Sequence, residues 1–186
     1  MAEYQHIAHG FDPVFDERSR VLVLGSFPSV LSRENAFYYG NPQNRFWRVM
    51  ASVLGEPVPS NEGEPLLVGG AAHPATLAES IEVKRQMLLR HGIALWDVIE
   101  SCDIKGSSDA SIKNVVPAQI ERVTDTATIE AVVCNGGTAG RLYKRYLQER
   151  TGIAALVLPS TSPANASWSL ERLTARWREA LTPLPV

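Results

Sequence analysis

Four short apolar runs divide the chain. They span residues 21–24, 93–96, 129–134 and 154–158. Each is nearly continuous in apolar residues instead of alternating with polar ones, which is typical of strands buried on both faces of a parallel sheet. The pattern therefore predicts four buried strands.

Helical spacing appears between and after these runs. One apolar stripe precedes residue 56, a second ends before Gly92, a third helix is expected over residues 138–150, and a fourth stripe lies near the C-terminus. The stripe residues are Phe46, Val49, Met50 and Leu54, then Ile81, Met87 and Leu88, and finally Leu170, Leu173, Trp177 and Leu181. Strands that alternate with helices predict an α/β fold, a three-layer sandwich with a central four-stranded parallel sheet flanked by helices.

Length and composition fit one domain. The chain has 186 residues, of which 45% are hydrophobic and 20% charged, close to the averages of globular proteins. The segment 56–73 is rich in Pro and Gly, and we expect it to be an irregular surface excursion instead of a linker. The sequence thus predicts a single domain over residues 1–186.

Charge, cysteine content and the N-terminus narrow the class of protein. The N-terminal segment has no basic and apolar leader, and no apolar stretch is long enough for a membrane span, so we expect a cytoplasmic protein without a membrane partner. Cys102 and Cys134 lack a C-x-x-C spacing and are expected to be buried reduced thiols, with no metal and no cofactor. The net charge of −2 lacks the footprint of a nucleic-acid binder, although clustered Lys and Arg or a site that contacts few phosphates would still allow one.

The segments that follow the predicted strands carry the candidate chemistry, because ligands of parallel sheets bind beyond the carboxyl ends of the strands. These segments contain GSFPS with AFYYGNPQNRFW, DVIESCDIKGSSDASIKN, NGGTAG and PSTSPANAS. They are rich in Asn, Ser and Tyr, with Asp97 and Asp109 as carboxylates. The four histidines, His6, His9, His73 and His91, fall outside them, which leaves no Ser-His-Asp or Cys-His arrangement. We expect an amide-rich site.

An amide-rich pocket with aromatic side chains suits a planar heterocycle, since Asn offers a donor and an acceptor while an aromatic ring stacks on the face. Phe27, Tyr38 and Tyr39 are the stacking candidates, and core packing is the alternative for each. Asn114 and Asn135 either read the edge of a base or serve as turn residues.

Neutral hydroxyl and amide groups at the strand ends can hold phosphate oxygens without excess positive charge. Turn and capping chemistry is the alternative for these residues, which are Ser26, Ser107, Ser108, Ser160, Ser162 and Asn165. NGGTAG is neither G-x-G-x-x-G nor a Walker motif, so we interpret its glycines as a tight turn between helix and strand.

Four ordered motifs, GSFPS, YYGNPQNRFW, LWDV with GSSDASI, and LPSTSPAN, resemble the uracil-DNA glycosylase superfamily, from about residue 10 to residue 177. They look most like its hypoxanthine-DNA glycosylase branch, family 6. Where many relatives place a water-activating Asp or Asn in the first motif, this chain has Phe27. The resemblance implies that this role passes to a nearby asparagine, for which we select Asn44, with Asn41 as the second candidate.

The resemblance also implies roles for other positions. Tyr39 matches the aromatic residue that stacks on the flipped base, and Asp97 stands where uracil-specific enzymes place a base-reading Asn. PSTSPAN matches the second superfamily motif, whose loop contacts the DNA backbone and enters the minor groove, with Leu158 in place of that motif's histidine.

The expected function is a DNA glycosylase that flips out and excises a deaminated base, hypoxanthine first, from double-stranded DNA, acting as a monomer. One alternative is a uracil or thymine mismatch DNA glycosylase. Another is a catalytically silent module that binds lesion DNA. A nucleoside hydrolase is disfavoured, because the Asp cluster for its metal is missing from the sequence.

Overall fold

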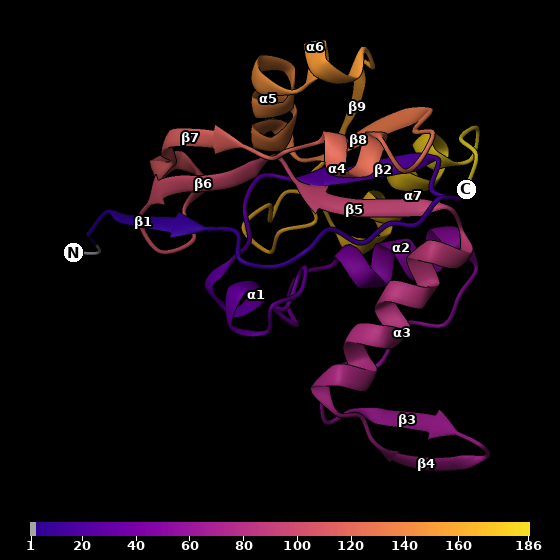
Figure 1. The fold of residues 1–186 in the computed structure, drawn as a ribbon. Helices are drawn as coiled ribbons and strands as arrows, with labels where there is room; N and C mark the ends of the chain where they lie inside the picture. The colour runs from indigo at the N-terminus through magenta and orange to yellow at the C-terminus, as the bar shows by residue number, and fades with distance from the viewer. Residues whose placement is uncertain (1–2) are drawn as a thin grey trace.

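The computed structural model describes residues 3–186, and a four-stranded parallel sheet lies at its centre (Figure 1). The strands are β2 (Val21–Gly25), β5 (Ile93–Asp97), β8 (Ala131–Asn135) and β9 (Ala155–Leu158), in the spatial order β5-β2-β8-β9. Val21 pairs with Ile93 on one side and with Ala131 on the other. The four predicted strands and their parallel arrangement are confirmed, with ends shifted by one or two residues. The predicted burial of the fourth strand is wrong, because β9 lies at the edge of the sheet, where Leu156 and Val157 are exposed.

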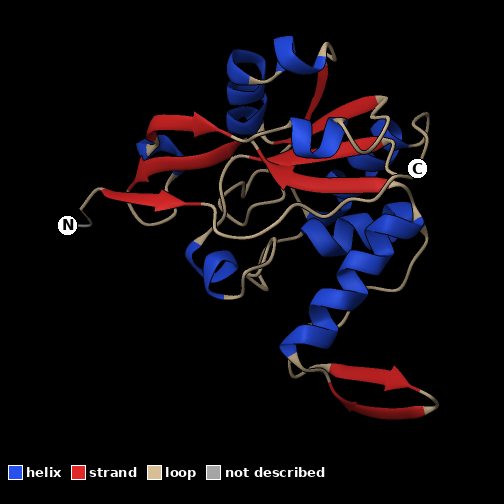
Figure 2. Ribbon diagram, viewed as in Figure 1, coloured by secondary structure: helices blue, strands red, loops and turns tan. Residues whose placement is uncertain are grey.

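Helices cover both faces of this sheet (Figures 1 and 2). One face carries α5 (Gly137–Tyr146) and α6 (Gln148–Thr151), and the other carries α2 (Phe46–Leu54), α3 (Leu77–Arg90) and α7 (Leu170–Leu181). Two short helices, α1 (Val30–Glu34) and α4 (Glu121–Thr124), lie within connections. The three-layer α/β sandwich is therefore confirmed.

The predicted helix over residues 138–150 is divided in two. Leu147 leaves the helical region with φ −120°, and its side chain is fully buried, so the chain bends where this residue enters the core. The predicted end of α3 is confirmed, since Arg90 is its last residue and Gly92 follows with φ +65°.

Two smaller sheets were not predicted. An antiparallel sheet contains β1 (Gln5–Ala8), β6 (Ile99–Ile104) and β7 (Lys113–Pro117), with β6 in the middle. The segment 56–73, expected to be irregular, contains β3 (Pro65–Val68) and most of β4 (Ala71–Pro74), which form a hairpin that projects from the body (Figure 1). That prediction was wrong because these strands are short and mostly exposed, so they lack the apolar alternation of a half-buried strand.

Both cysteines lie in the core. Cys102 and Cys134 are free and fully buried, as predicted, and burial raises their pKa values to about 11 and about 12, which keeps both thiols protonated. Within residues 3–186, no helix is long and apolar enough to cross a membrane.

The glycines of NGGTAG allow α5 to pack closely on the sheet. A Cβ atom at Gly140 would lie 2.5 Å from Val157 Cγ2, so a side chain cannot fit there without displacing β9. Gly136 adopts φ +101° at the start of the turn. The tight turn predicted for this motif is present.

Candidate active site

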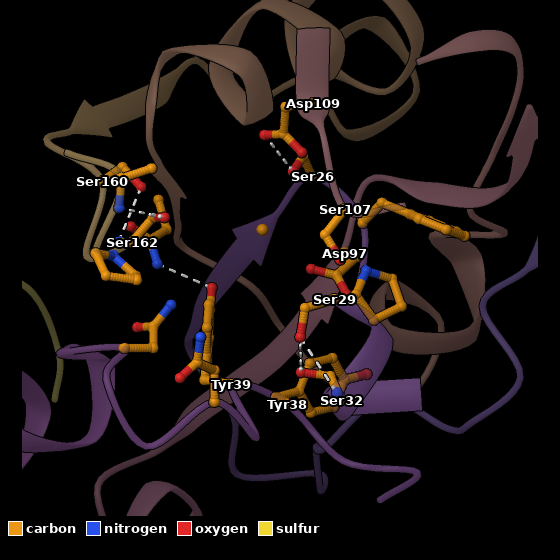
Figure 3. Close-up of a pocket in the computed structure, with 18 of the residues that line it drawn as sticks. Ser26, Ser29, Ser32, Tyr38, Tyr39, Asp97, Ser107, Asp109, Ser160 and Ser162 are labelled. Atoms are coloured by element: carbon orange, nitrogen blue, oxygen red, sulfur yellow. Dashed lines mark hydrogen bonds between the residues drawn. The ribbon is translucent and has the colours of Figure 1, made fainter. Parts of the chain in front are cut away.

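A cleft of about 620 Å³ opens at the carboxyl ends of the central strands. Its walls come from the segments after β2 and β9, from the last residues of β5 and β8, and from residues 107–109, which follow β6. The parallel sheet brings the four strand ends to one edge (Figure 3). The predicted site residues that line the cleft are Ser26, Phe27, Tyr39, Asn41, Asn44, Asp97, Ser107, Ser108, Asn135, Ser160, Ser162 and Asn165.

Asn114 is the predicted site residue that the structure places elsewhere. It lies on the exposed strand β7 with φ +50°, and its Nδ2 donates to Asp103 Oδ2 at 2.6 Å. The sequence offered no sign that residues 113–117 form a strand of the second sheet, which carries Asn114 away from the cleft.

Asn135 lines the cleft, but other side chains already occupy its amide. Its Nδ2 donates to Tyr39 Oη at 3.0 Å and to Thr161 Oγ1 at 2.9 Å, and its Oδ1 accepts from the backbone N–H of Thr161 at 3.0 Å. In this arrangement Asn135 positions Tyr39 and Thr161. Thr161, which is fully buried, joins two loops of the site and was not singled out from the sequence.

Tyr39 is held firmly at the edge of the open space (Figure 3). Its backbone has φ +51°, an uncommon conformation for a residue with a bulky side chain, and its ring stacks on Phe46 at 4.1 Å between centroids. Burial, followed by the negative charge of Asp97, raises the pKa of Tyr39 well above its ordinary value. The hydroxyl is therefore neutral at physiological pH. Tyr38 also lines the cleft, but its side chain is nearly fully buried and its hydroxyl donates to the Asp12 carbonyl at 3.0 Å, as the core-packing alternative expects.

The amides of Asn44 and Asn41 are fixed by backbone N–H groups. Asn44 Oδ1 accepts from the N–H of Phe46 and from Thr161 Oγ1, both at 2.9 Å. Asn41 Oδ1 accepts from the N–H of Gln43 at 2.9 Å. Because an N–H group requires an acceptor, both amide orientations are defined, and neither Nδ2 has a hydrogen-bond partner within residues 3–186. The pair presents two oriented donors, and Asn41 Oδ1 retains one lone pair.

His9 lies outside the strand-end loops, as predicted, and does not line the cleft, but it contacts a residue that does. Its Nε2 lies 2.9 Å from Asp97 Oδ2, and the two side chains are almost completely buried. His9 follows β1 and its N–H donates to the Glu100 carbonyl at 2.8 Å, so the unpredicted second sheet delivers it to the end of β5. The sequence did not predict this contact, because His9 is far from Asp97 in the sequence and precedes every predicted strand.

Gly25 leaves space for these polar groups. A Cβ atom at this position would lie 2.3 Å from Asp97 Oδ1 and 3.1 Å from Tyr39 Oη. The two oxygens thus converge on the last residue of β2. Only glycine fits there without displacing them.

One rim of the cleft is the loop after β9, and Arg45 fastens it. The guanidinium group of Arg45 donates to backbone carbonyl groups along this loop, which belong to Thr161, Ser162, Asn165 and Trp168. The segments NRFW and PSTSPAN, which are far apart in the sequence, are joined by this side chain and by the hydrogen bond between Thr161 and Asn44. We did not predict this role for Arg45.

The opposite rim comes from residues 105–111, which include the 3-10 turn Asp109–Ser111. Ser26 Oγ donates to Asp109 Oδ2 at 2.9 Å (Figure 3). Ser107 Oγ accepts from the N–H of Val30 at 3.0 Å. Both contacts are long-range, because they join this rim to the segment after β2. Ser160 Oγ and Ser162 Oγ instead make local turn contacts, since they accept from the N–H groups of Ser162 and Ala164, and they also face the cleft. For these two serines the turn role and the DNA-backbone role are both compatible with the geometry.

Comparison with known families settles the ancestry of this cleft. The sequence profile of the uracil DNA glycosylase superfamily matches residues 13–181. The chain belongs to this superfamily. The matched region contains all four motifs, so the resemblance noted in the sequence is confirmed.

Relatives within the superfamily span nearly the whole chain. A hypoxanthine DNA glycosylase of Methanosarcina barkeri is 33% identical over 92% of this chain and 96% of its own length. One of the same name from Methanosarcina acetivorans is 30% identical over 89% and 93%. A solution NMR structure from Methanosarcina acetivorans, described as a candidate uracil DNA glycosylase, has a TM-score of 0.73 and 29% identity, covering 98% of this chain and 100% of its own.

Proposed function

We propose that this superfamily member is a DNA glycosylase that takes a deaminated base, hypoxanthine in particular, into the cleft and hydrolyses its N-glycosidic bond. The observation that carries the proposal is the pair of oriented amides, Asn44 and Asn41, in a cleft that also holds Tyr39 and Asp97. The names of the two curated relatives support hypoxanthine as the base.

The base enters the cleft by rotation out of the duplex, which costs a few kcal/mol and least for a mispaired base. Phe27 and Tyr39 provide aromatic surface for its face. Asp97 Oδ1, which has no hydrogen-bond partner within residues 3–186, provides an acceptor for its edge. A deaminated base, being mispaired, is favoured at the extrusion step and again at the edge.

Hydrolysis in this site depends on position more than on a strong base. The bond between C1′ and the base nitrogen breaks with its electron pair on the base, and a water oxygen bonds to the resulting oxocarbenium-like carbon. An Asn44 or Asn41 amide orients that water, and the proton that the water loses ends on the departing base or in solvent. An amide orients water but does not remove a proton, so the rate enhancement comes from orientation and electrostatics.

The DNA backbone lies along the two serine-rich rims in this proposal. Ser107 and Ser108 form one rim, and Ser160, Ser162 and Asn165 form the other. Hydroxyl and amide donors of this kind hold phosphate oxygens in a chain whose net charge is −2. The enzyme then acts on double-stranded DNA as a single domain and as a monomer.

The test compares Asn44→Ala with wild type on end-labelled duplexes that carry one hypoxanthine. We expect alkali-dependent strand cleavage by wild type and a loss of at least about hundredfold in Asn44→Ala, since removing one oriented polar group commonly costs that much. DNA affinity, measured by fluorescence anisotropy, should change little.

Gln43→Ala is the matched control, because Gln43 is exposed in the same loop and only its backbone N–H contacts Asn41. This variant should cleave like wild type. Near-normal turnover by Asn44→Ala would refute the role of Asn44, and no cleavage by wild type would refute the activity.

Uracil is the second candidate base, because a solved structural relative is described as a candidate uracil DNA glycosylase. Uracil and hypoxanthine both present a ring N–H beside a carbonyl group. Release of uracil in place of hypoxanthine would select this candidate.

A further inference from the structure

We propose that His9 is a positioning residue that keeps Asp97 a pure hydrogen-bond acceptor toward the cleft, so that the site selects bases with the ring N–H that deamination creates. This inference rests on the proposed function and names the chemical feature by which the substrate is recognised.

The hydrogen-bond partners of His9 determine where its protons lie. Nδ1 lies 3.0 Å from the backbone carbonyl of Phe11, which can only accept, so Nδ1 carries a proton and donates it. Nε2 lies 2.9 Å from Asp97 Oδ2. One further proton must lie between these two atoms, either on the imidazole or on the carboxyl group.

Asp97 presents the same acceptor to the cleft wherever the shared proton lies. If the proton is on Nε2, Asp97 is a carboxylate; if it is on Oδ2, the acid donates it to Nε2. In either case Oδ1 carries no proton. The Asp97 side chain is only 6% exposed, and Gly25 leaves room for Oδ1 at the end of β2.

Deamination changes the edge of a base from a ring lone pair to a ring N–H. Adenine has a lone pair on N1 and cytosine has one on N3, whereas their deamination products, hypoxanthine and uracil, carry a hydrogen at those atoms. An oxygen that only accepts binds the N–H and repels the lone pair. An unpaired polar atom in a buried site carries a large penalty, so this contact discriminates strongly.

His9 is needed because it fixes the side of the Asp97 carboxyl group on which a proton can lie. A buried carboxyl group without a partner favours its neutral form, and its proton could then point into the cleft. Such a group would donate to the lone pair of adenine. The imidazole prevents this by holding the shared proton on the side of the carboxyl group that faces away from the base.

The test replaces the Asp97 carboxyl group with an amide, which has one donor end and one acceptor end. Its preference for a base then reports which end faces the cleft. In Asp97→Asn, the amide nitrogen should donate to His9 Nε2, which leaves Oδ1 toward the cleft. We expect this variant to release hypoxanthine about tenfold more slowly, since a charged acceptor is replaced by a neutral one. Its preference for the deaminated base should be retained. In the double variant His9→Phe with Asp97→Asn nothing orients the amide, and the preference should fall by about tenfold or more.

Preference is measured as the ratio of dissociation constants for two duplexes that carry non-hydrolysable 2′-fluoro-deoxyinosine or 2′-fluoro-deoxyadenosine opposite thymine. The cost of extruding each base is the same for every variant, so changes in the ratio report the site alone. His6→Phe is the matched control. His6 lies on the same N-terminal segment as His9 and also pairs with an aspartate, Asp103, at 2.8 Å, but it is exposed and outside the cleft. The ratio for this variant should equal that of wild type.

An equal ratio in Asp97→Asn with and without His9 would overturn the inference while leaving the proposed function intact. Failure of wild type to release any base, together with equal affinity for the two duplexes, would overturn both. A purely structural role of His9 predicts a lower melting temperature and an unchanged ratio.

Discussion

Gly25 lies between two polar groups on which the cleft depends. Asp97 Oδ1 and Tyr39 Oη both lie against the space beside its α-carbon. His9 holds the other oxygen of Asp97, Oδ2, and Asn135 holds Tyr39 Oη. The chemistry therefore rests on a few oriented atoms. A displacement of about 1 Å at such a site can cost about a hundredfold in rate.

Gly25→Ala is expected to lower base release by about a hundredfold or more, because its Cβ would lie 2.3 Å from Asp97 Oδ1. The cost to the free energy of unfolding should be about 1–3 kcal/mol, the range of an overpacked core. Single-turnover assays and urea denaturation measure the two effects.

Gly137→Ala is the comparison variant, since a Cβ atom there meets nothing within 4 Å. It should retain the wild-type rate. A wild-type rate in Gly25→Ala would show that the space beside Asp97 is not needed.

At the scale of elements, the buried strands could be predicted and the second sheet could not. Strands β2, β5, β8 and β9 are apolar on both faces, which leaves a strong pattern in the sequence. Strand β1 is short and mostly exposed, and β6 and β7 are irregularly paired. None of the three shows a clear period of two in its apolar residues. The error at Asn114 and the omission of His9 both follow from this weak signal.

The predicted site residues came together because parallel strands end at one edge, a rule that needs no side-chain detail. The contacts that orient them could not be predicted. Thr161 and Arg45 connect loops more than a hundred positions apart, and a single sequence contains no sign of such pairs.

Arg45→Met is expected to loosen the loop after β9, because several backbone carbonyl groups lose their donor at once. The N–H groups of Asn165 and Trp168, which bond within this loop, should exchange hydrogen at least about tenfold faster. Affinity for duplex DNA should fall, since this loop forms one rim.

Arg48→Met removes an exposed arginine three positions away and should leave the loop unchanged. Amide exchange of β2 and β5 serves as the internal reference in both variants. Unchanged exchange of the loop in Arg45→Met would contradict the role assigned to Arg45.

At the scale of the whole molecule, the chain combines the cleft of its superfamily with an almost balanced charge. There are 18 basic and 20 acidic residues, so the net charge of −2 gives no overall attraction to DNA. We expect contact with DNA to depend on the cleft, on the hydroxyl and amide groups of its rims and on local clusters of Lys and Arg. We expect a deaminated base, hypoxanthine first, to be the group released.

The most direct test is one duplex that carries hypoxanthine and uracil at two different positions of the same labelled strand. Alkali treatment after incubation converts each abasic site into a fragment of its own length, so the two bases compete within one molecule. We expect the hypoxanthine fragment first and in excess. A fragment from the uracil position alone, or no fragment at all, would contradict the proposed release of hypoxanthine.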